Sequence, residues 1–266
     1  MGNDNSNSIK RSWIDVMPKW GWLCLSLITA IIVWTILSIM PSTSRSFPNI
    51  FAVTSSIATM IDRKVFWVDI SNSLSSVLIG FLIGFLLALP ISILMAWYRP
   101  IRFIIEPWIQ FIRNIPPLAY VPLVVISVGV GKTPQIIVIT IATFLIMTIT
   151  IFQGVININP MLIKAARVLG AKDKDIFIRV IVPASLPFIL TAIRLGTAVA
   201  LTSLIAAEST GATSGLGMRI KALNNTFESS PMLLYIIIIG VIGLIFEQLV
   251  KMLERRLTGW QEKVEN

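Results

Sequence analysis

Six long apolar stretches restrict the folds that this sequence can adopt. An α-helix needs about 20 mainly apolar residues to cross a bilayer, and six segments meet or approach that length. In chain order they are Trp20–Met40, Ser73–Tyr98, Trp108–Val130, Pro134–Ile156, Pro183–Ala207 and Met232–Leu253. Because lipid offers no hydrogen bonds, each segment must satisfy its own backbone groups. The pattern therefore predicts an all-α integral membrane protein with six transmembrane helices.

The composition supports this fold class and excludes several functions. Of the 266 residues, 55% are hydrophobic and 13% are charged, which leaves too few charges to cover a soluble globule. The net charge of +9 comes from short clusters beside apolar stretches, which indicates a topological signal and not a nucleic-acid-binding surface. The chain has no histidine and one cysteine, Cys24. An internal disulfide is excluded, and a membrane-embedded enzyme would lack its commonest general base and metal ligand.

The distribution of lysine and arginine predicts the orientation in the membrane. The amino terminus, the turn 99–113, the loop 164–179 and the carboxyl tail hold 15 basic residues, whereas the alternate loops hold 6. Basic residues gather on the cytoplasmic side, so both termini and the central loop are expected there. We therefore expect a cytoplasmic segment 1–19, a six-span domain 20–253 and a cytoplasmic tail 254–266. The loop 41–72 is expected to carry a short helix, Asn49–Met60, on the outer surface.

The central loop, residues 157–183, contains its own helix signals. Asn159 before Pro160 is typical of a helix N-cap and first position, and Gly170 is placed for a left-handed C-cap. The apolar face of this helix is expected to carry Met161, Leu162, Ala165, Ala166 and Leu169. A second helix is expected to begin near Asp173 and to stop at Pro183. One interpretation is an amphipathic segment on the bilayer surface; the other is a surface that presents two small alanines to a partner protein.

The spacing of this loop supports the second interpretation. Two adjacent alanines are followed by three residues, a glycine, nine residues, and then valines and a proline: Ala165, Ala166, Gly170, Val180, Val182 and Pro183. This pattern resembles the EAA loop of bacterial ABC importer permeases, with Lys164 in place of the usual leading acidic residue. The resemblance implies a coupling helix that docks in a cleft of a cytoplasmic ATPase. The residues that it assigns to this contact are Ala165, Ala166, Leu169, Gly170 and Pro183.

A second segment, 113–135, carries a more specific resemblance. Its sequence, RNIPPLAYVPLVVISVGVGKTPQ, is similar to the third span of the nitrate, sulfonate, taurine and bicarbonate branch of these permeases, with Ser127 and Val128 in place of tryptophan and phenylalanine. The tail ERRLTGWQEK is also similar to that branch. The resemblance implies the type I importer fold: a homodimer of six-span subunits in the inner membrane, bound to two ATPases and supplied by an external substrate-binding protein.

Nucleotide chemistry is expected in a partner and not in this chain. Gly131, Lys132 and Thr133 match the end of a phosphate-binding loop, but the full pattern needs a glycine where Ile126 stands and a preceding strand. We therefore expect no cofactor in this chain, with ATP and Mg²⁺ bound by the ATPase.

Several residues within the spans are candidates for the translocation path or its gate. They are Arg113, Pro116, Pro117, Ser203 and Glu208. Glu208 lies at membrane depth, where an ionisable group is costly and faces a cavity or a partner; it is expected either to shape the gate or pair with Arg194 or Arg219, or else to cap the next turn. Arg113 is expected either to attract an anion or, in preference, to mark the cytoplasmic boundary.

The resemblance thus implies the transmembrane subunit of an ATP-driven importer for a small anion, with sulfonates such as taurine first and nitrate or bicarbonate next. The alternative is an ion-coupled secondary transporter or channel. Such a protein usually has ionisable groups deep in several spans and often an inverted repeat.

Overall fold

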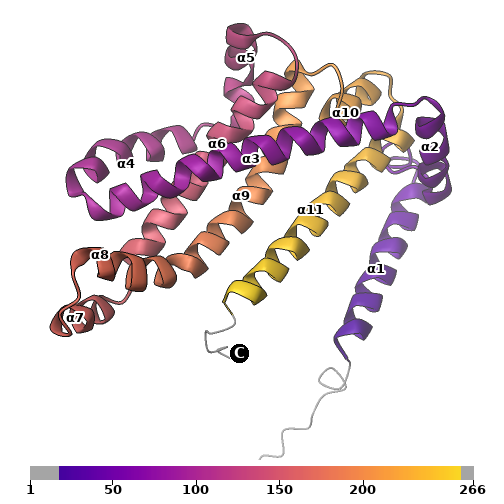
Figure 1. The fold of residues 1–266 in the computed structure, drawn as a ribbon. Coiled ribbons are helices and arrows are strands. Elements are labelled where there is room, and N and C mark those ends of the chain that lie inside the picture. Colours follow the sequence, from indigo (N-terminus) through magenta and orange to yellow (C-terminus); the bar gives the residue numbers. More distant parts are fainter. Residues whose placement is uncertain (1–17, 259–266) are drawn as a thin grey trace, which may run out of the picture.

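A computed structural model describes residues 18–258, and within that range the chain is helical without strands (Figure 1). The helices are α1 (Lys19–Ile39), α2 (Ile50–Asp62), α3 (Phe66–Trp97), α4 (Arg99–Arg113), α5 (Pro117–Val128), α6 (Lys132–Ile156), α7 (Pro160–Val168), α8 (Asp173–Ile176), α9 (Val182–Gly211), α10 (Leu216–Asn225) and α11 (Ser229–Leu257), with a π-helical turn, η2 (Phe177–Ile181), between α8 and α9. Most of the expected segment 1–19, and the tail beyond residue 258, lie outside the described residues.

Within residues 18–258, five helices are long and apolar enough to cross a membrane, and the bent pair α4 and α5 makes a sixth if it is one broken span. Helix α6 is the centre of the bundle, since it contacts α3, α4, α5 and α9 and is the most buried of the spans. Small residues allow its close packing: a Cβ built on Gly80 of α3 would lie 2.8 Å from Ile139, and one on Gly84 would collide with Thr143. Small residues of α3 therefore allow a close helix–helix contact with α6.

Helix α1 lies at the side of this bundle (Figure 1), and none of the residues in its apolar stretch is buried. Its Trp34 Nε1 donates to the carbonyl of Pro48, 3.0 Å away, just before α2. The expected short helix is confirmed as α2, which the Asn49 side chain caps by accepting from the backbone N–H of Phe51. Its position on the outer surface stays a prediction. Most of the apolar surface of α1 is left to lipid or to another protein.

The third expected span, Trp108–Val130, is wrong as a single helix. The segment from Arg99 to Arg113 forms the helix α4, which sequence analysis treated as a turn, and α5 begins only at Pro117. The two helices are bent by 100° at the break. Pro116 and Pro117 explain the bend, because the residue before a proline is pushed out of the α region and a proline suits the first helical position.

The predicted stop at Pro183 is also wrong. From Asp173 to Gly211 the chain forms one long helical segment, although the turn before Pro183 is π-helical. Proline lacks a backbone N–H, and in an α-helix its ring would collide with the carbonyl four residues earlier. A π-turn widens the hydrogen-bond spacing and relieves this conflict, so the helix bulges and continues.

Helix α3 begins at Phe66, seven residues before the expected start at Ser73. The extra turns carry polar side chains, among them Asp69, and apolar patterning alone would exclude them from a span. The described partners of Asp69 come from α10, the turn before it, and α11. Contacts with distant parts of the chain therefore extend this helix.

Candidate coupling and translocation sites

The central loop forms the expected helix and glycine turn. Asn159 Oδ1 accepts a hydrogen bond of 2.9 Å from the N–H of Met161, which caps α7. At the other end, Gly170 N–H donates to Arg167 and Ala171 N–H donates to Ala166, which is the Schellman arrangement. Gly170 has φ +81°, a conformation that L side chains rarely adopt. The turn between α7 and α8, which we call the elbow (residues 169–172), is thus set by local sequence.

The two faces of α7 differ from the predicted pattern. Ile163 and Ala166 pack toward a buried cluster formed by Ile158, Ile176 and Ile181. The opposite face is apolar but uncovered, with Met161 65% and Leu169 86% exposed. The residues that the described structure leaves exposed on α7 and at its end include Met161, Leu162, Lys164, Ala165, Val168 and Leu169. Ala166 therefore packs against the buried cluster, whereas the Ala165 side chain is exposed.

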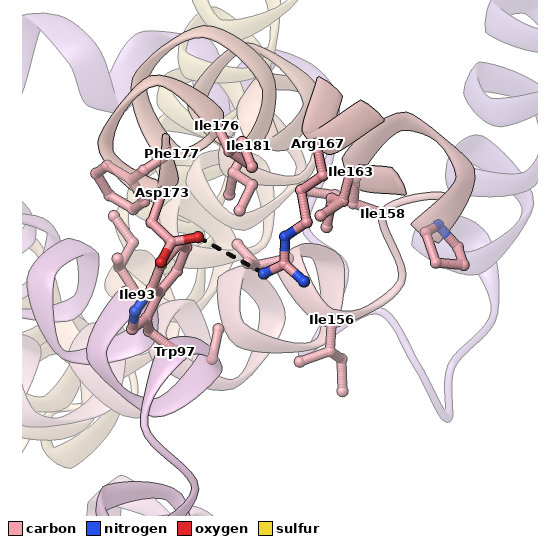
Figure 2. Close-up of a pocket in the computed structure, with 13 residues that line it drawn as sticks. Ile93, Trp97, Ile156, Ile158, Ile163, Arg167, Asp173, Ile176, Phe177 and Ile181 are labelled. Carbon is pink, nitrogen blue, oxygen red and sulfur yellow. Dashed lines mark ion pairs between the residues drawn. The ribbon is translucent and has the colours of Figure 1, made fainter. Parts of the chain in front are cut away.

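A cavity of about 560 Å³ lies under the elbow (Figure 2). Its walls come from the ends of α3 and α6 together with α7, α8 and η2. Arg167 and Asp173 point toward each other across the elbow, with Nη2 and Oδ1 3.6 Å apart. The Trp97 ring of α3 meets the Phe177 ring of η2 edge-on at 5.5 Å. The elbow is therefore attached to the ends of two spanning helices. Pro183, in the first turn of α9, is exposed beside this region.

The break between α4 and α5 forms a second cavity, of about 350 Å³, against α6 and α9. Arg113 and Pro117, two of the predicted path residues, line it, and Pro116 caps α5 beside it. Its α6 wall is Ala142, Leu145 and Ile146, which lie in the middle of that helix. Arg113 therefore lies beside the middle of α6, whereas the boundary interpretation expects it at the end of a span. The reason is the 100° bend, which places the end of α4 beside the middle of α6.

Glu208 is buried at the end of α9 and does not pair with either predicted arginine. Its Oε2 accepts the Gly217 N–H at 2.7 Å, and its Oε1 accepts the Ser73 hydroxyl at 2.6 Å. The capping interpretation is therefore the one that the structure supports, since Gly217 is in the first turn of α10. Gly215 is required beside it, because its φ is +129° and a Cβ there would collide with the carboxylate.

Sequence analysis missed Asp69, which is the centre of the same polar cluster. Its carboxylate accepts hydrogen bonds from Arg219 Nε at 2.7 Å, Gly215 N–H at 3.0 Å and the Tyr235 hydroxyl at 3.2 Å. The side chain is fully buried, and the hydrogen bond to it raises the pKa of Arg219 above its usual value. A lone aspartate before an apolar run was the available signal, since a carboxylate beside a span needs a partner. Asp69, Ser73, Glu208, Arg219 and Tyr235 are called the outer cluster below.

The remaining polar candidates lie elsewhere. Ser203 of α9 is fully buried, and its hydroxyl has no hydrogen-bond partner in the described part of the chain. Arg194 pairs with Glu254 of α11. Glu247 pairs with Lys251, with Oε1 and Nζ 2.6 Å apart, as the spacing of four predicts. Lys132 starts α6 and donates to the Ser75 hydroxyl at 2.6 Å.

Comparison with known proteins assigns the family. The model of the binding-protein-dependent transport system inner membrane component matches residues 80–259. The chain belongs to this family. A probable ABC transporter permease protein of Brucella abortus (strain 2308) is 47% identical over 73% of this chain and 78% of its own length. The taurine transport system permease protein TauC of Escherichia coli (strain K12) is 31% identical over 93% of this chain and 95% of its own length.

A solved structure supports the fold. The inward-facing MetNI methionine ABC transporter matches with a TM-score of 0.65 and 18% identity, over 73% of this chain and 97% of the matched chain. The predicted class, an all-α type I importer permease, is therefore confirmed. The protein is a multi-pass transport subunit of the inner membrane, and such permeases work in general with an ATPase and a binding protein.

Proposed function

We propose that this permease is the translocation subunit of an ATP-driven importer for a small anion, with taurine and related sulfonates as the first candidates and nitrate or bicarbonate next. The support for the anion class is the 31% identity with TauC over 93% of the chain. Two copies of the chain form the path in this proposal. Two ATPases bind ATP and Mg²⁺, and an extracytoplasmic binding protein delivers the substrate.

The observation that carries the coupling part of the proposal is the uncovered apolar face of α7. Val168 and Leu169 are 88% and 86% exposed at the end of the bundle opposite α2 and α10 (Figure 1). Exposed apolar residues grouped on a short rigid helix are typical of a protein contact. The partner contact is assigned to Ala165, Leu169 and Gly170, with Ala166 and Pro183 supporting it.

The elbow transmits movement in this proposal. ATP closure in the partner shifts α7, and the packed walls of the cavity in Figure 2 carry that shift into α3, α6 and the π-helical turn. The bundle then opens alternately to either side. Both termini and the loop 157–183 lie in the cytoplasm, and residues 20–253 form the membrane domain.

Ala165→Glu tests the proposed contact. Ala165 is exposed, so the substitution leaves the interior of the permease unchanged. An unpaired carboxylate buried in an ATPase cleft costs several kcal/mol. We expect the variant to insert normally but to lose most of the ATPase that copurifies with the wild type. Ala166→Glu is a poorer test, because Ala166 packs against Ile158, Ile176 and Ile181 and its replacement would disturb α7 itself.

Ala58→Glu is the matched control, because Ala58 is also exposed on a short helix but lies in α2 at the other end of the molecule. It should retain the ATPase. Normal copurification and normal uptake by Ala165→Glu would show that α7 is not the coupling surface.

A further inference from the structure

The cavity at the break between α4 and α5 has a chemical character that differs from its surroundings. Its polar lining consists of Arg113, Asn114, Tyr120 and Thr202, and no acidic side chain is among the described residues that line it. Each of these groups carries a hydrogen-bond donor, and one carries a fixed positive charge. Arg113 makes no ion pair and Tyr120 makes no hydrogen bond with the described residues. The Thr202 hydroxyl already donates to the backbone of its own helix, and the Asn114 amide donates to the carbonyl of Gln110 with one hydrogen left over. The donors left for a ligand are therefore the Arg113 guanidinium, the Tyr120 hydroxyl and one amide hydrogen of Asn114.

The cavity lies beside the middle of α6, and the Arg113 side chain at its wall is exposed. Gly131 N–H donates to the carbonyl of Gly211 at 3.0 Å, so the loop after α5 lies beside the end of α9. The 12 residues of α5 extend about 18 Å from that end, at a rise of about 1.5 Å per residue. Helix α6 has 25 residues and is about twice as long. Arg113, the last residue of α4, lines the same cavity as Pro117 at the far end of α5 and therefore lies near half the length of α6.

An arginine without a carboxylate partner is unfavourable at this depth unless it faces water or a ligand. Arg194, in the middle of α9, has Glu254 as its partner. Arg102 of the same helix α4 is paired with Glu106, with Nε and Oε2 2.9 Å apart. Arg113 differs from both because its described surroundings provide no counter-charge. The missing counter-charge is best supplied by a transported anion.

We propose that this cavity is a transient binding site for the transported anion, with Arg113 as its charge partner and the Tyr120 hydroxyl and Asn114 amide as orienting donors. The inference rests on the proposed anion import and names the site at which the anion is held within the membrane. A guanidinium can donate two parallel hydrogen bonds to two oxygens of a sulfonate or carboxylate. A cavity of about 350 Å³ accepts a molecule the size of taurine together with water. A lipid phosphate has the same chemistry, but its headgroup stays at the ends of the spans.

The first test measures taurine uptake into proteoliposomes that contain the complete importer with its ATPase and binding protein. Arg113→Gln should lower uptake about tenfold or more, because a hydrogen bond to a charged group is lost. Arg113→Lys should keep part of the activity, and Tyr120→Phe should raise the taurine concentration needed for half-maximal uptake. Arg99→Gln is the matched control: it removes the same charge from the exposed start of α4, away from the cavity, and should stay near wild type.

The second test separates binding from a structural role. In a Cys24→Ala background, Arg113→Cys should react with charged methanethiosulfonates, and taurine should slow that reaction in the assembled complex. Modification with the cationic reagent should restore part of the uptake, whereas the anionic reagent should not. Anionic vesicles without taurine show whether lipid phosphate alone gives the same protection, an outcome that would assign the cavity to lipid.

Two results would overturn the proposed site while leaving anion import intact. One is near-normal uptake by Arg113→Gln. The other is a thiol reaction rate of Arg113→Cys that taurine does not change. If Arg113→Gln fails to assemble, Tyr120→Phe and the protection measurement decide. If the wild-type complex carries none of taurine, nitrate and bicarbonate, the proposed function fails and the site fails with it.

Discussion

At the residue scale, the outer cluster shows how one buried carboxylate can organise several helices. Asp69 of α3 holds Arg219 of α10 and Tyr235 of α11, and Glu208 of α9 caps α10 through Gly217. Four helices therefore meet around two carboxylates at one end of the bundle. A carboxylate whose hydrogen bonds are all satisfied is tolerated inside a protein, whereas a lone one is costly.

Asp69→Asn should weaken this end of the molecule. The amide removes the negative charge beside Arg219 and replaces one of the two oxygens that accept the four hydrogen bonds from Arg219, Gly215 and Tyr235. Breaking a buried ion pair costs about 3–5 kcal/mol in unfolding free energy, and we expect a lower thermal unfolding midpoint in detergent. Asp62→Asn, at the exposed end of α2, is the control and should have little effect. An unchanged midpoint for Asp69→Asn would mean that the cluster does not stabilise the fold.

At the element scale, the elbow depends on a conformation that one residue provides. Gly170 has φ +81°, and no atom lies within 4 Å of where a Cβ would be placed. The constraint is therefore on the backbone and not on space. The Schellman hydrogen bonds from Gly170 and Ala171 fix the direction in which the chain leaves α7 and enters α8.

Gly170→Val should change that direction without adding charge. A β-branched residue in the left-handed region costs about 1–2 kcal/mol or more, so the chain is expected to relax to another turn. We predict that the variant still copurifies with some ATPase but loses the stimulation of ATP hydrolysis by the loaded binding protein. Gly240→Val is the control, since Gly240 lies in α11 with open space around it and no positive φ. Full stimulation in Gly170→Val would show that the elbow geometry does not matter for coupling.

At the scale of the whole molecule, the structure has two different ends. One end carries α7, α8 and the elbow, and the other carries α2, α10 and the outer cluster (Figure 1). The basic residues follow this division, with Lys164, Arg167, Lys172, Lys174 and Arg179 at the elbow end. Arg113 leaves the basic group at the elbow end because it lines the cavity beside the middle of α6, but the asymmetry remains.

Single cysteines test the orientation. In a Cys24→Ala background, Lys172→Cys on the elbow and Lys221→Cys on α10 are both at exposed positions. We expect a membrane-impermeant maleimide to label only Lys221→Cys when applied from outside, and only Lys172→Cys when applied to inverted vesicles. A permeant maleimide should label both and serves as the control. Labelling of Lys172→Cys from outside would reverse the orientation.

The sequence by itself determined the features that depend on local physical chemistry. Apolar length identified the membrane class and placed the helices α1, α6, α9 and α11 to within a few residues. It failed for the start of α3, where polar residues intervene, and for the third span, where prolines break the helix. The caps of α7 followed from Asn159, Pro160 and Gly170, because a capping side chain and a glycine act on their own neighbours. The resemblance of the loop 157–183 to a permease family could also be recognised from the sequence, because its motif lies in contiguous residues.

The tertiary structure decided whatever depends on contacts between distant segments. Asp69 and Arg219 are 150 positions apart in the chain, so no local pattern could pair them or extend α3 to include Asp69. The same holds for the faces of α7, where packing on Ile158, Ile176 and Ile181 turned Ala166 inward and left Ala165 outside. Prolines marked the break after Arg113, but the angle of 100° and the neighbouring helix set its depth. Burial and charge pairing are properties of the assembled bundle, and a charged residue acquires its role only when its neighbours are known.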